Sequence, residues 1–226
     1  MWFRYSLYKM PLILKVEEGS PQREEAIRKA ARLIRHGSVV AFPTETFYGL
    51  AALATDYNAI AKVYLLKRRA IYKSLSILVA DLSELENWIE NLSREARHLV
   101  TRFWPGPLTL VCSARKELPP NLTAGTGKIA VRISSHPVAQ ALVQEVGGPI
   151  TATSANRSGS PNFRSCEEVL SQLGHELEAI VDAGLTPGGK VSTIADVTTC
   201  PPKVLRSGAI SAQEVLSCWE ASAQKG

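Results

Sequence analysis

The sequence has 226 residues, of which 45% are hydrophobic and 21% are charged, a globular composition with enough length for one sizeable domain and a single buried core. The net charge of +5 suggests an anionic partner such as a nucleotide or RNA, although the basic residues are scattered and explain solubility equally well. The four cysteines stand far apart, without a CxxC pair or a histidine at ligand spacing. They indicate neither a zinc site nor a disulfide framework, so we expect free thiols in a reducing cytosol and no metal-ligating residues.

The N-terminal stretch MWFRYSLYKMPLILKV is aromatic and apolar, but Arg4 and Lys9 interrupt it well short of a signal-peptide core. No apolar run approaches the length of a membrane span. Met10 is an alternative start of the chain. We therefore expect a cytoplasmic protein with no membrane partner, in which residues 1–12 form a poorly ordered extension and residues 13–226 form the folded domain.

Helical and extended patterns alternate through the first two thirds of the chain, and strands crowd the last third. The predicted helices cover residues 21–36, 57–69, 81–91, 93–103, 137–146 and 165–173, with a last amphipathic helix from residue 211. The predicted strands cover residues 38–42, 75–80, 108–113, 128–133, 149–153, 179–182, 192–197 and 203–205, and residues 116–127 form a polar loop. This order argues for one α/β domain with a mixed sheet.

Capping residues support several of these boundaries. Ser20-Pro21 combines an N-cap with proline at the first helical position, and Gly37 stands where a C-terminal glycine belongs. Asp56 can cap the second helix, and Ser165 with Glu168 forms a capping box.

The stretch AFPTETFYGL at residues 41–50 is the most informative. An apolar run stops at Pro43, and Thr44, Glu45, Thr46 and Tyr48 follow it at close spacing. An abrupt change from apolar to polar at a strand end is where open α/β sheets place their ligands. A solvated strand-to-helix turn is the alternative for this segment.

Other predicted strands also end in polar clusters. These clusters are Ser134-Ser135-His136, Ser154 with Asn156, Asp182 and Arg206. Each one alone is typical of a turn, but together they would converge on one concave surface. They hold few carboxylates and no second histidine, so general-base or metal-triad chemistry has little to work with.

The sequence offers cations instead. Lys67 and Arg69, at the end of a predicted helix, could clamp a phosphate or could complement the helix dipole. Arg132 stands in an otherwise apolar strand, where burial without an anionic partner is unfavourable, and we interpret it as a ligand-facing cation.

The ordered motifs resemble those of the YrdC/Sua5 family. They are PTETFYGL (43–50), K-x-R (Lys67, Arg69), WPGPLTLV (104–111), AVR with HP (130–132, 136–137), TSANRSG (153–159), ST-I-x-D (192–196) and LRSG (205–208). The resemblance covers nearly everything from residue 20 to residue 210, and the length is similar to that of short, single-domain members.

The resemblance implies a YrdC/RibB-like fold, a twisted mixed sheet curled around a central basic cavity. It also implies a threonylcarbamoyl-AMP synthase, a nucleotidyltransferase that joins L-threonine, bicarbonate and ATP as substrates, with Mg²⁺, and releases pyrophosphate. A transferase complex would then pass the threonylcarbamoyl group to adenosine 37 of tRNA. Contact with tRNA or double-stranded RNA is a further expectation.

The resemblance also assigns roles by motif position. The implied threonine contacts are Thr44, Tyr48, Arg132, Ser154 and Ser192. The implied ATP contacts are Lys67, Arg69, Asn156 and Arg206, of which Lys67 and Arg69 are the catalytic cations. One departure is clear, because the family usually reads K-G-R-P where this chain has Lys67-Arg68-Arg69-Ala70.

Two alternatives stay open. A non-catalytic module of the YciO type would bind RNA or a nucleotide without turnover, with a steep dependence on salt. Carbamoyl-adenylate formation in hydrogenase maturation uses a related domain, but that domain normally sits in a longer chain with zinc-finger cysteines.

Overall fold

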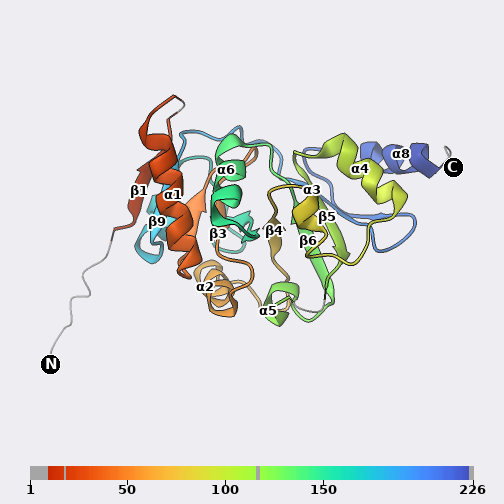
Figure 1. Ribbon diagram of the computed structural model, residues 1–226, viewed down its shortest axis with the longest axis horizontal. Coiled ribbons are helices and arrows are strands. Elements are labelled where there is room, and N and C mark those ends of the chain that lie inside the picture. Colours follow the sequence, from red (N-terminus) through yellow and green to blue (C-terminus); the bar gives the residue numbers. More distant parts are fainter. Residues whose placement is uncertain (1–9, 18, 116–117, 224–226) are drawn as a thin grey trace.

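The computed structural model describes residues 10–17, 19–115 and 118–223 and has a mixed α/β fold (Figure 1). The strands are β1 (Leu12–Lys15), β2 (Val40–Phe42), β3 (Gly49–Ala51), β4 (Ser76–Leu78), β5 (Leu108–Ser113), β6 (Lys128–Arg132), β7 (Ile150–Thr151), β8 (Thr153–Ser154), β9 (Ala179–Asp182), β10 (Thr193–Asp196) and β11 (Lys203–Arg206). The helices are α1 (Gln22–Arg35), α2 (Tyr57–Lys67), α3 (Leu82–Leu85), α4 (Arg94–Phe103), α5 (Pro120–Thr123), α6 (Pro137–Val146), α7 (Cys166–Leu173) and α8 (Ala212–Ala223). The predicted α/β class and single domain are confirmed.

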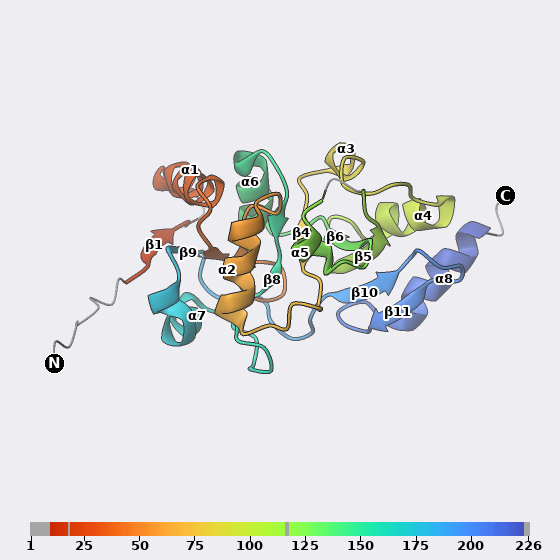
Figure 2. The same ribbon diagram turned by 90° about the horizontal axis from the view of Figure 1, so that it is seen from below.

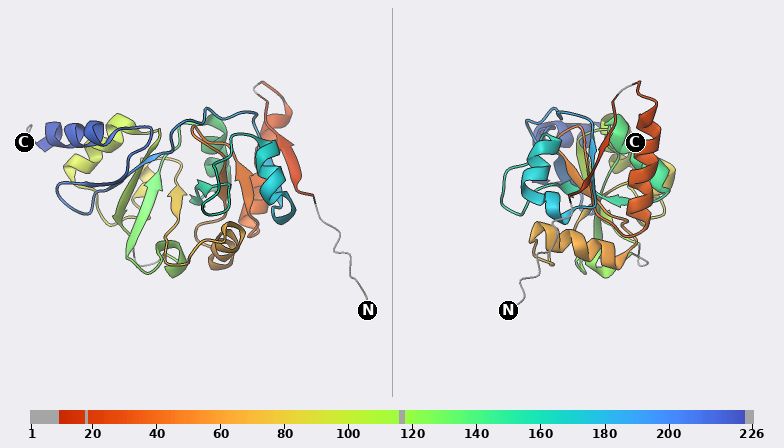
Figure 3. Two further views of the ribbon diagram at one scale, coloured as in Figure 1. Left: turned by 180° about the vertical axis from the view of Figure 1, so that it is seen from behind. Right: turned by 90° about the vertical axis from the view of Figure 1, so that its left-hand side faces the viewer.

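The first sheet has the strand order β1-β9-β2-β3-β8. β9 runs parallel to both β1 and β2, and β3 pairs antiparallel with β2 and β8. Because side chains alternate along a strand, Val40 and Phe42 pack under α1 and α6 while Ala41 faces the opposite core. Figures 2 and 3 show α1 and α6 on one face of this sheet and α7 on the other.

The second sheet has the order β11-β10-β5-β6-β4-β7 and is also mixed. Its core includes Leu108, Leu110 and Ala195, which are completely buried. α4 and α8 lie side by side at this end of the molecule (Figures 1 and 2). The amphipathic pattern predicted from residue 211 is thus explained, since Val215 of α8 faces this core.

The two sheets are joined at a seam between β3 and β7. The Ala52 carbonyl accepts the Thr151 amide at 2.9 Å, and Leu53 and Ile150 form an isolated antiparallel bridge. The short strands β7 and β8 follow one another in the chain, yet β7 belongs to the second sheet and β8 to the first. Polar residues from both sheets therefore meet at this seam.

Several boundaries differ from those predicted. Leu12, placed in the N-terminal extension, already pairs with Ala179 in β1, whereas residues 1–9 lie outside the described residues. The predicted 81–91 helix is reduced to α3, and α5 forms within the predicted loop. β3 was not predicted. Within the described ranges, no helix is long and apolar enough to cross a membrane.

Candidate active site

A cavity of about 320 Å³ opens at the seam between the two sheets. Its walls come from the loop after β2, the loop after α2, strands β5, β6 and β8, and the segments around β10 and β11. The predicted site residues that line it are Thr44, Tyr48, Arg69, Arg132, Ser154, Ser192 and Arg206. Lys67 and Asn156 are not among the lining residues.

The loop after β2 is shaped by the Thr44 hydroxyl. It donates to the Phe47 carbonyl at 2.7 Å and accepts the Thr46 and Phe47 amides at 3.2 and 3.3 Å. These hydrogen bonds form the turn that Thr and Ser favour after a strand. Thr44 and Thr46 thereby place two hydroxyls, 3.1 Å apart, at the cavity wall.

The Tyr48 side chain is directed elsewhere. Tyr48 is completely buried, and its hydroxyl donates to the Gly184 carbonyl at 2.9 Å, beyond the cavity. Burial, reinforced by the nearby Asp182 carboxylate, raises the pKa of this phenol well above its ordinary value. The hydroxyl predicted to contact threonine is therefore already engaged, and its role here is to hold the loop.

Arg132 is 5% exposed and lines the cavity from β6. Its Nη1 atom donates to Glu45 Oε1 at 3.0 Å, and the Ser134 hydroxyl donates to Glu45 Oε2. The anionic partner that a buried arginine needs is thus supplied by the protein itself, as the carboxylate of Glu45. Glu45 was named only as part of a polar cluster, and the buried Arg132 was the one signal that could have singled it out.

Two further arginines line the cavity, Arg69 from the loop after α2 and Arg206 from β11, which β10 and β5 separate from β6 in the second sheet. Arg69 donates to the carbonyls of Lys73 and Ser74 at 3.1 and 2.9 Å. Arg206 donates to the Ser192 carbonyl and hydroxyl, both at 3.0 Å. Burial lowers the pKa of Arg206, and repulsion from Arg132 and Arg69 adds to the effect. Three guanidinium groups therefore surround one cavity, and none of the described lining residues is Asp or Glu.

Lys67 requires a correction. The sequence suggested an exposed cation at a helix end, but Lys67 is only 2% exposed. Its Nζ atom donates to the Ser154 carbonyl, the Asn156 carbonyl at 2.7 Å and the Asn156 side-chain oxygen at 3.2 Å. Burial, with the nearby Arg69 charge, lowers its pKa to about 7. In this structure Lys67 fixes the segment that carries Ser154, and Asn156 accepts from Lys67 instead of facing the cavity.

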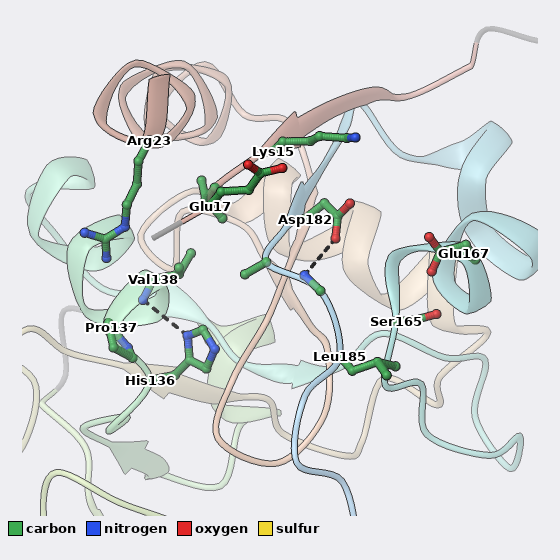
Figure 4. A pocket seen from close by; sticks show the side chains of 13 residues that line it. Lys15, Glu17, Arg23, His136, Pro137, Val138, Ser165, Glu167, Asp182 and Leu185 are labelled. Atoms are coloured by element: carbon green, nitrogen blue, oxygen red, sulfur yellow. Dashed lines mark hydrogen bonds between the residues drawn. The ribbon is translucent and has the colours of Figure 1, made fainter. Parts of the chain in front are cut away.

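The other polar clusters line a second cavity of about 620 Å³, shown in Figure 4. His136 and Asp182 lie in its wall, so the predicted convergence of all strand ends on one surface is wrong. Asp182 ends β9, which β2 and β3 separate from the seam in the first sheet, and His136 stands four residues beyond Arg132, at the start of α6. His136 caps α6 by accepting the Val138 amide at its Nδ1 atom, and burial lowers its pKa. Over the described ranges, no three His, Cys, Asp or Glu residues are grouped as metal ligands.

A mixed α/β fold with an arginine-rich cavity at the junction of two sheets defines a small-molecule-binding protein with a preference for anions. The sequence model of Sua5/YciO/YrdC, described as "Telomere recombination", matches residues 32–208, and the chain belongs to this family. The resemblance stated from the motifs is confirmed.

Two relatives with assigned names are both threonylcarbamoyl-AMP synthases. The chain is similar to threonylcarbamoyl-AMP synthase of Pyrococcus abyssi, with 40% identity over 206 residues, which are 91% of this chain and 60% of that protein. It is 34% identical to threonylcarbamoyl-AMP synthase of Photobacterium profundum, covering 80% of this chain and 98% of that protein. The chain thus spans 60% of the length of the archaeal relative and nearly all of the bacterial one.

Solved structures agree on the fold. P. abyssi Sua5 complexed with L-threonine superposes with a TM-score of 0.88 at 40% identity, covering 92% of this chain and 60% of that one. Escherichia coli YciO superposes with a TM-score of 0.83 at 28% identity, covering 92% of this chain and all of the other.

Proposed function

We propose that the protein is a threonylcarbamoyl-AMP synthase, a nucleotidyltransferase that converts L-threonine, bicarbonate and ATP into threonylcarbamoyl-AMP and pyrophosphate. The observation that carries the proposal is the convergence of Arg69, Arg132 and Arg206 on one cavity whose lining holds no carboxylate. Such a cavity favours ligands with several negative charges. The similarity to synthases and to a threonine-bound structure supports the choice of substrates.

The proposed reaction depends on the positioning of the substrates more than on reactive protein side chains. The carbamate of threonine is itself the nucleophile, its oxygen attacks the α-phosphorus of ATP, and pyrophosphate leaves. The protein must bring two anions together and neutralise the charge that develops on the leaving group. Arginines and hydroxyls suffice for both tasks.

We assign the threonine end of the cavity to Arg132 and to the hydroxyls of Thr44 and Ser154. The Ser192 hydroxyl, which accepts from Arg206, would contact threonine where it meets ATP. Arg132 would bind the carboxylate, for which a guanidinium offers a matched pair of donors. Tyr48 would act through the loop it anchors, because its hydroxyl bonds to Gly184.

We assign the phosphates of ATP to Arg69 and Arg206, which line the cavity from the loop after α2 and from β11, a strand that β10 and β5 separate from Arg132 on β6. Among the described residues, both donate to neutral oxygens. Lys67 and Asn156 would be positioning residues for the Ser154 segment. Magnesium normally binds protein carboxylates together with substrate phosphates, and none of the described residues that line the cavity is Asp or Glu. The residues present do not form a resident Mg²⁺ site.

The product is a mixed anhydride, so a partner transferase complex must consume it, and tRNA is the proposed final acceptor. We infer a cytoplasmic location from that role. The predicted domain of residues 13–226, extended by Leu12 of β1, would then be the catalytic domain.

The direct test is pyrophosphate release from ATP by the purified protein, with and without L-threonine and bicarbonate. Release that depends on threonine, is not supported by glycine, and yields a threonylcarbamoyl-AMP mass would support the proposal. Absence of release from folded protein that binds ATP would contradict it.

Two variants test the assignment of the cavity ends. Arg132→Ala should raise the KM for threonine about 10- to 100-fold with a small effect on the KM for ATP, because it removes charge-assisted hydrogen bonds from one substrate. Arg206→Ala should do the reverse. Arg28→Ala, on the exposed face of α1, is the matched control. Equal effects of either cavity variant on both substrates would contradict the assignment.

A second candidate is a nucleotide- or RNA-binding module without turnover, as in the YciO alternative. One observation favours it: Ile71 and Tyr72, in the loop after α2, are 77% and 73% exposed beside the exposed Arg68 and Lys73. Exposed aromatic and basic residues are typical of surfaces on which bases stack. RNA binding that weakens steeply with salt, without pyrophosphate release, would favour this function.

A further inference from the structure

The three arginines of the cavity differ in what they are bonded to. Arg69 and Arg206 donate to neutral carbonyl and hydroxyl oxygens, so each retains its full positive charge. Arg132 donates to the Glu45 carboxylate at 3.0 Å. Its charge is therefore largely cancelled before any ligand arrives.

The Arg132–Glu45 pair is rigid and poorly screened. The two side chains are 7% and 13% exposed, so water and salt weaken their electrostatic effect much less than at the surface. The Ser134 hydroxyl also donates to Glu45, which fixes the carboxylate in place. Glu45 thus places a carboxylate directly behind the Arg132 end of a basic cavity.

Arg132 nevertheless keeps donors for a ligand. Among the described residues, its only hydrogen bond leaves from Nη1. The Nε and Nη2 atoms form the edge of a guanidinium that matches the two oxygens of a carboxylate. Arg132 can therefore bind a carboxylate side-on while it remains paired with Glu45.

We propose that Glu45 is a specificity-determining residue, which reserves Arg132 for a singly charged carboxylate and restricts polyphosphate to Arg69 and Arg206. This inference rests on the proposed function and names the residue that keeps its two anionic substrates apart. Repulsion by Glu45 grows in proportion to ligand charge, so it is about three times larger for pyrophosphate than for one carboxylate. Without Glu45, pyrophosphate and the ATP phosphates would compete for the threonine end.

The proposal is tested first on the unaltered protein by calorimetric binding of L-threonine and inorganic pyrophosphate. Because the two anions occupy different ends, saturating pyrophosphate should change the Kd for threonine by less than about 2-fold. Competitive displacement of threonine by pyrophosphate would overturn the proposal. This measurement does not depend on whether any variant folds.

Glu45→Gln keeps the shape of the side chain and removes its charge; the amide oxygen can still accept from Arg132, and the NH2 group can donate to the Ser134 hydroxyl, which then accepts instead of donating. We expect pyrophosphate to bind about 5- to 10-fold more tightly and to become a competitor of threonine. In an Arg132→Gln background the same change should give no gain, because the gain acts through Arg132. Glu24→Gln, an exposed carboxylate on α1, changes the net charge equally and is the matched control.

The outcomes separate this inference from the proposed function. If Glu45 only stabilises the fold, Glu45→Gln will weaken both ligands together, and that result would overturn the inference. Unchanged pyrophosphate affinity in an active enzyme would also overturn it, while the synthase function stands. A third outcome is that Glu45→Gln binds pyrophosphate more tightly and in competition with threonine, while the unaltered protein releases no pyrophosphate from ATP. That result would support the role of Glu45 in specificity and contradict the proposed reaction.

Discussion

At the scale of single residues, Lys67 shows how burial decides the role of a charge. Its ammonium group supplies hydrogen bonds to the Ser154 carbonyl and to both oxygens of Asn156. A buried acceptor left without its donor is strongly unfavourable. Lys67 is therefore expected to matter to folding as well as to the site.

Lys67→Met should lower the free energy of unfolding by about 2–4 kcal/mol, because it orphans buried oxygens. Urea denaturation followed by circular dichroism measures this change. Lys29→Met, an exposed lysine on α1, is the control and should change stability by less than about 0.5 kcal/mol. If Lys67→Met changes the free energy of unfolding as little as the control does and yet abolishes turnover, the phosphate-binding role suggested by the motif would be supported instead.

The sequence could predict which residue types gather at the cavity, but not how they are paired. Arg132 in an apolar strand requires an anion, and the anion was taken to be the ligand. Glu45 lies 87 positions away in the chain, and only the tertiary fold brings the two together. Lys67 is the same case, since two of its acceptors are backbone carbonyls, which carry no sequence signal, and the third is the side chain of Asn156, 89 positions away.

At the scale of elements, the end of α2 carries strain at Arg68. The backbone of Arg68 is left-handed, with φ of 47°, and its amide caps the helix by bonding to the Leu65 and Tyr64 carbonyls. A side chain at this position is unfavourable by about 1 kcal/mol relative to glycine. The family motif, which has glycine here, fits this geometry better than the present sequence.

Arg68→Gly should therefore raise the free energy of unfolding by about 0.5–1 kcal/mol. Arg68→Ala removes the same guanidinium but keeps the Cβ atom, so it should give no gain. Chemical denaturation of the two variants in parallel tests the point. A gain shared by both would show that charge, and not backbone strain, limits stability at this helix end.

An ion pair that spans β5, between Lys128 of β6 and Asp196 of β10, provides a pH-dependent contact. Lys128 Nζ donates to Asp196 at 2.8 Å and to Thr198 at 2.7 Å. Burial raises the pKa of Asp196, but the hydrogen bonds from Lys128 and Thr198 outweigh it and hold the pKa below its ordinary value. A depressed pKa in the folded state stabilises the protein above the unfolded pKa, and the contribution is lost as pH falls through the folded value.

Asp196→Asn should lower the free energy of unfolding by about 1–2 kcal/mol at neutral pH, a modest effect because the Lys128 side chain is 40% exposed. The difference from the unaltered protein should shrink once pH drops below about 4. Denaturation curves at a series of pH values measure it. A difference that does not vary with pH would show that Asp196 contributes through packing alone.

Elements with strong local signals were predicted best. α6 and β5 have the predicted limits, and the capping box of Ser165 and Glu168 is present. β3, β7 and β8 are strands of two or three residues that depend on pairing across the seam. The local propensity of β3 is too weak to be recognised, and the change of sheet between β7 and β8 falls within the single strand predicted at 149–153, so one mixed sheet was predicted where two occur.

At the scale of the whole molecule, the cysteines differ in how far the fold buries them. Cys112 and Cys166 are buried, and burial raises their thiol pKa values to about 12 and about 11, whereas Cys200 is exposed. Thiolates, not thiols, react with alkylating agents. Iodoacetamide at about pH 8 should therefore modify Cys200 in the native protein and reach Cys112 and Cys166 only after unfolding.

Peptide mass spectrometry of native and urea-treated samples measures the modification at each cysteine. Labelling of Cys112 at the native rate of Cys200 would contradict the burial of Cys112 in the core.

The placement of β9 between β1 and β2 also has a consequence for how the chain is made. β2 ends at Phe42 and β9 begins at Ala179. A ribosome adds about 5–20 residues per second, so β1 and the open edge of β2 emerge roughly 7–27 s before the strand that joins them. Throughout that interval the first sheet of the nascent protein is incomplete. β1 and β2 can be joined only after β9 has been made, when more than three quarters of the chain has been translated.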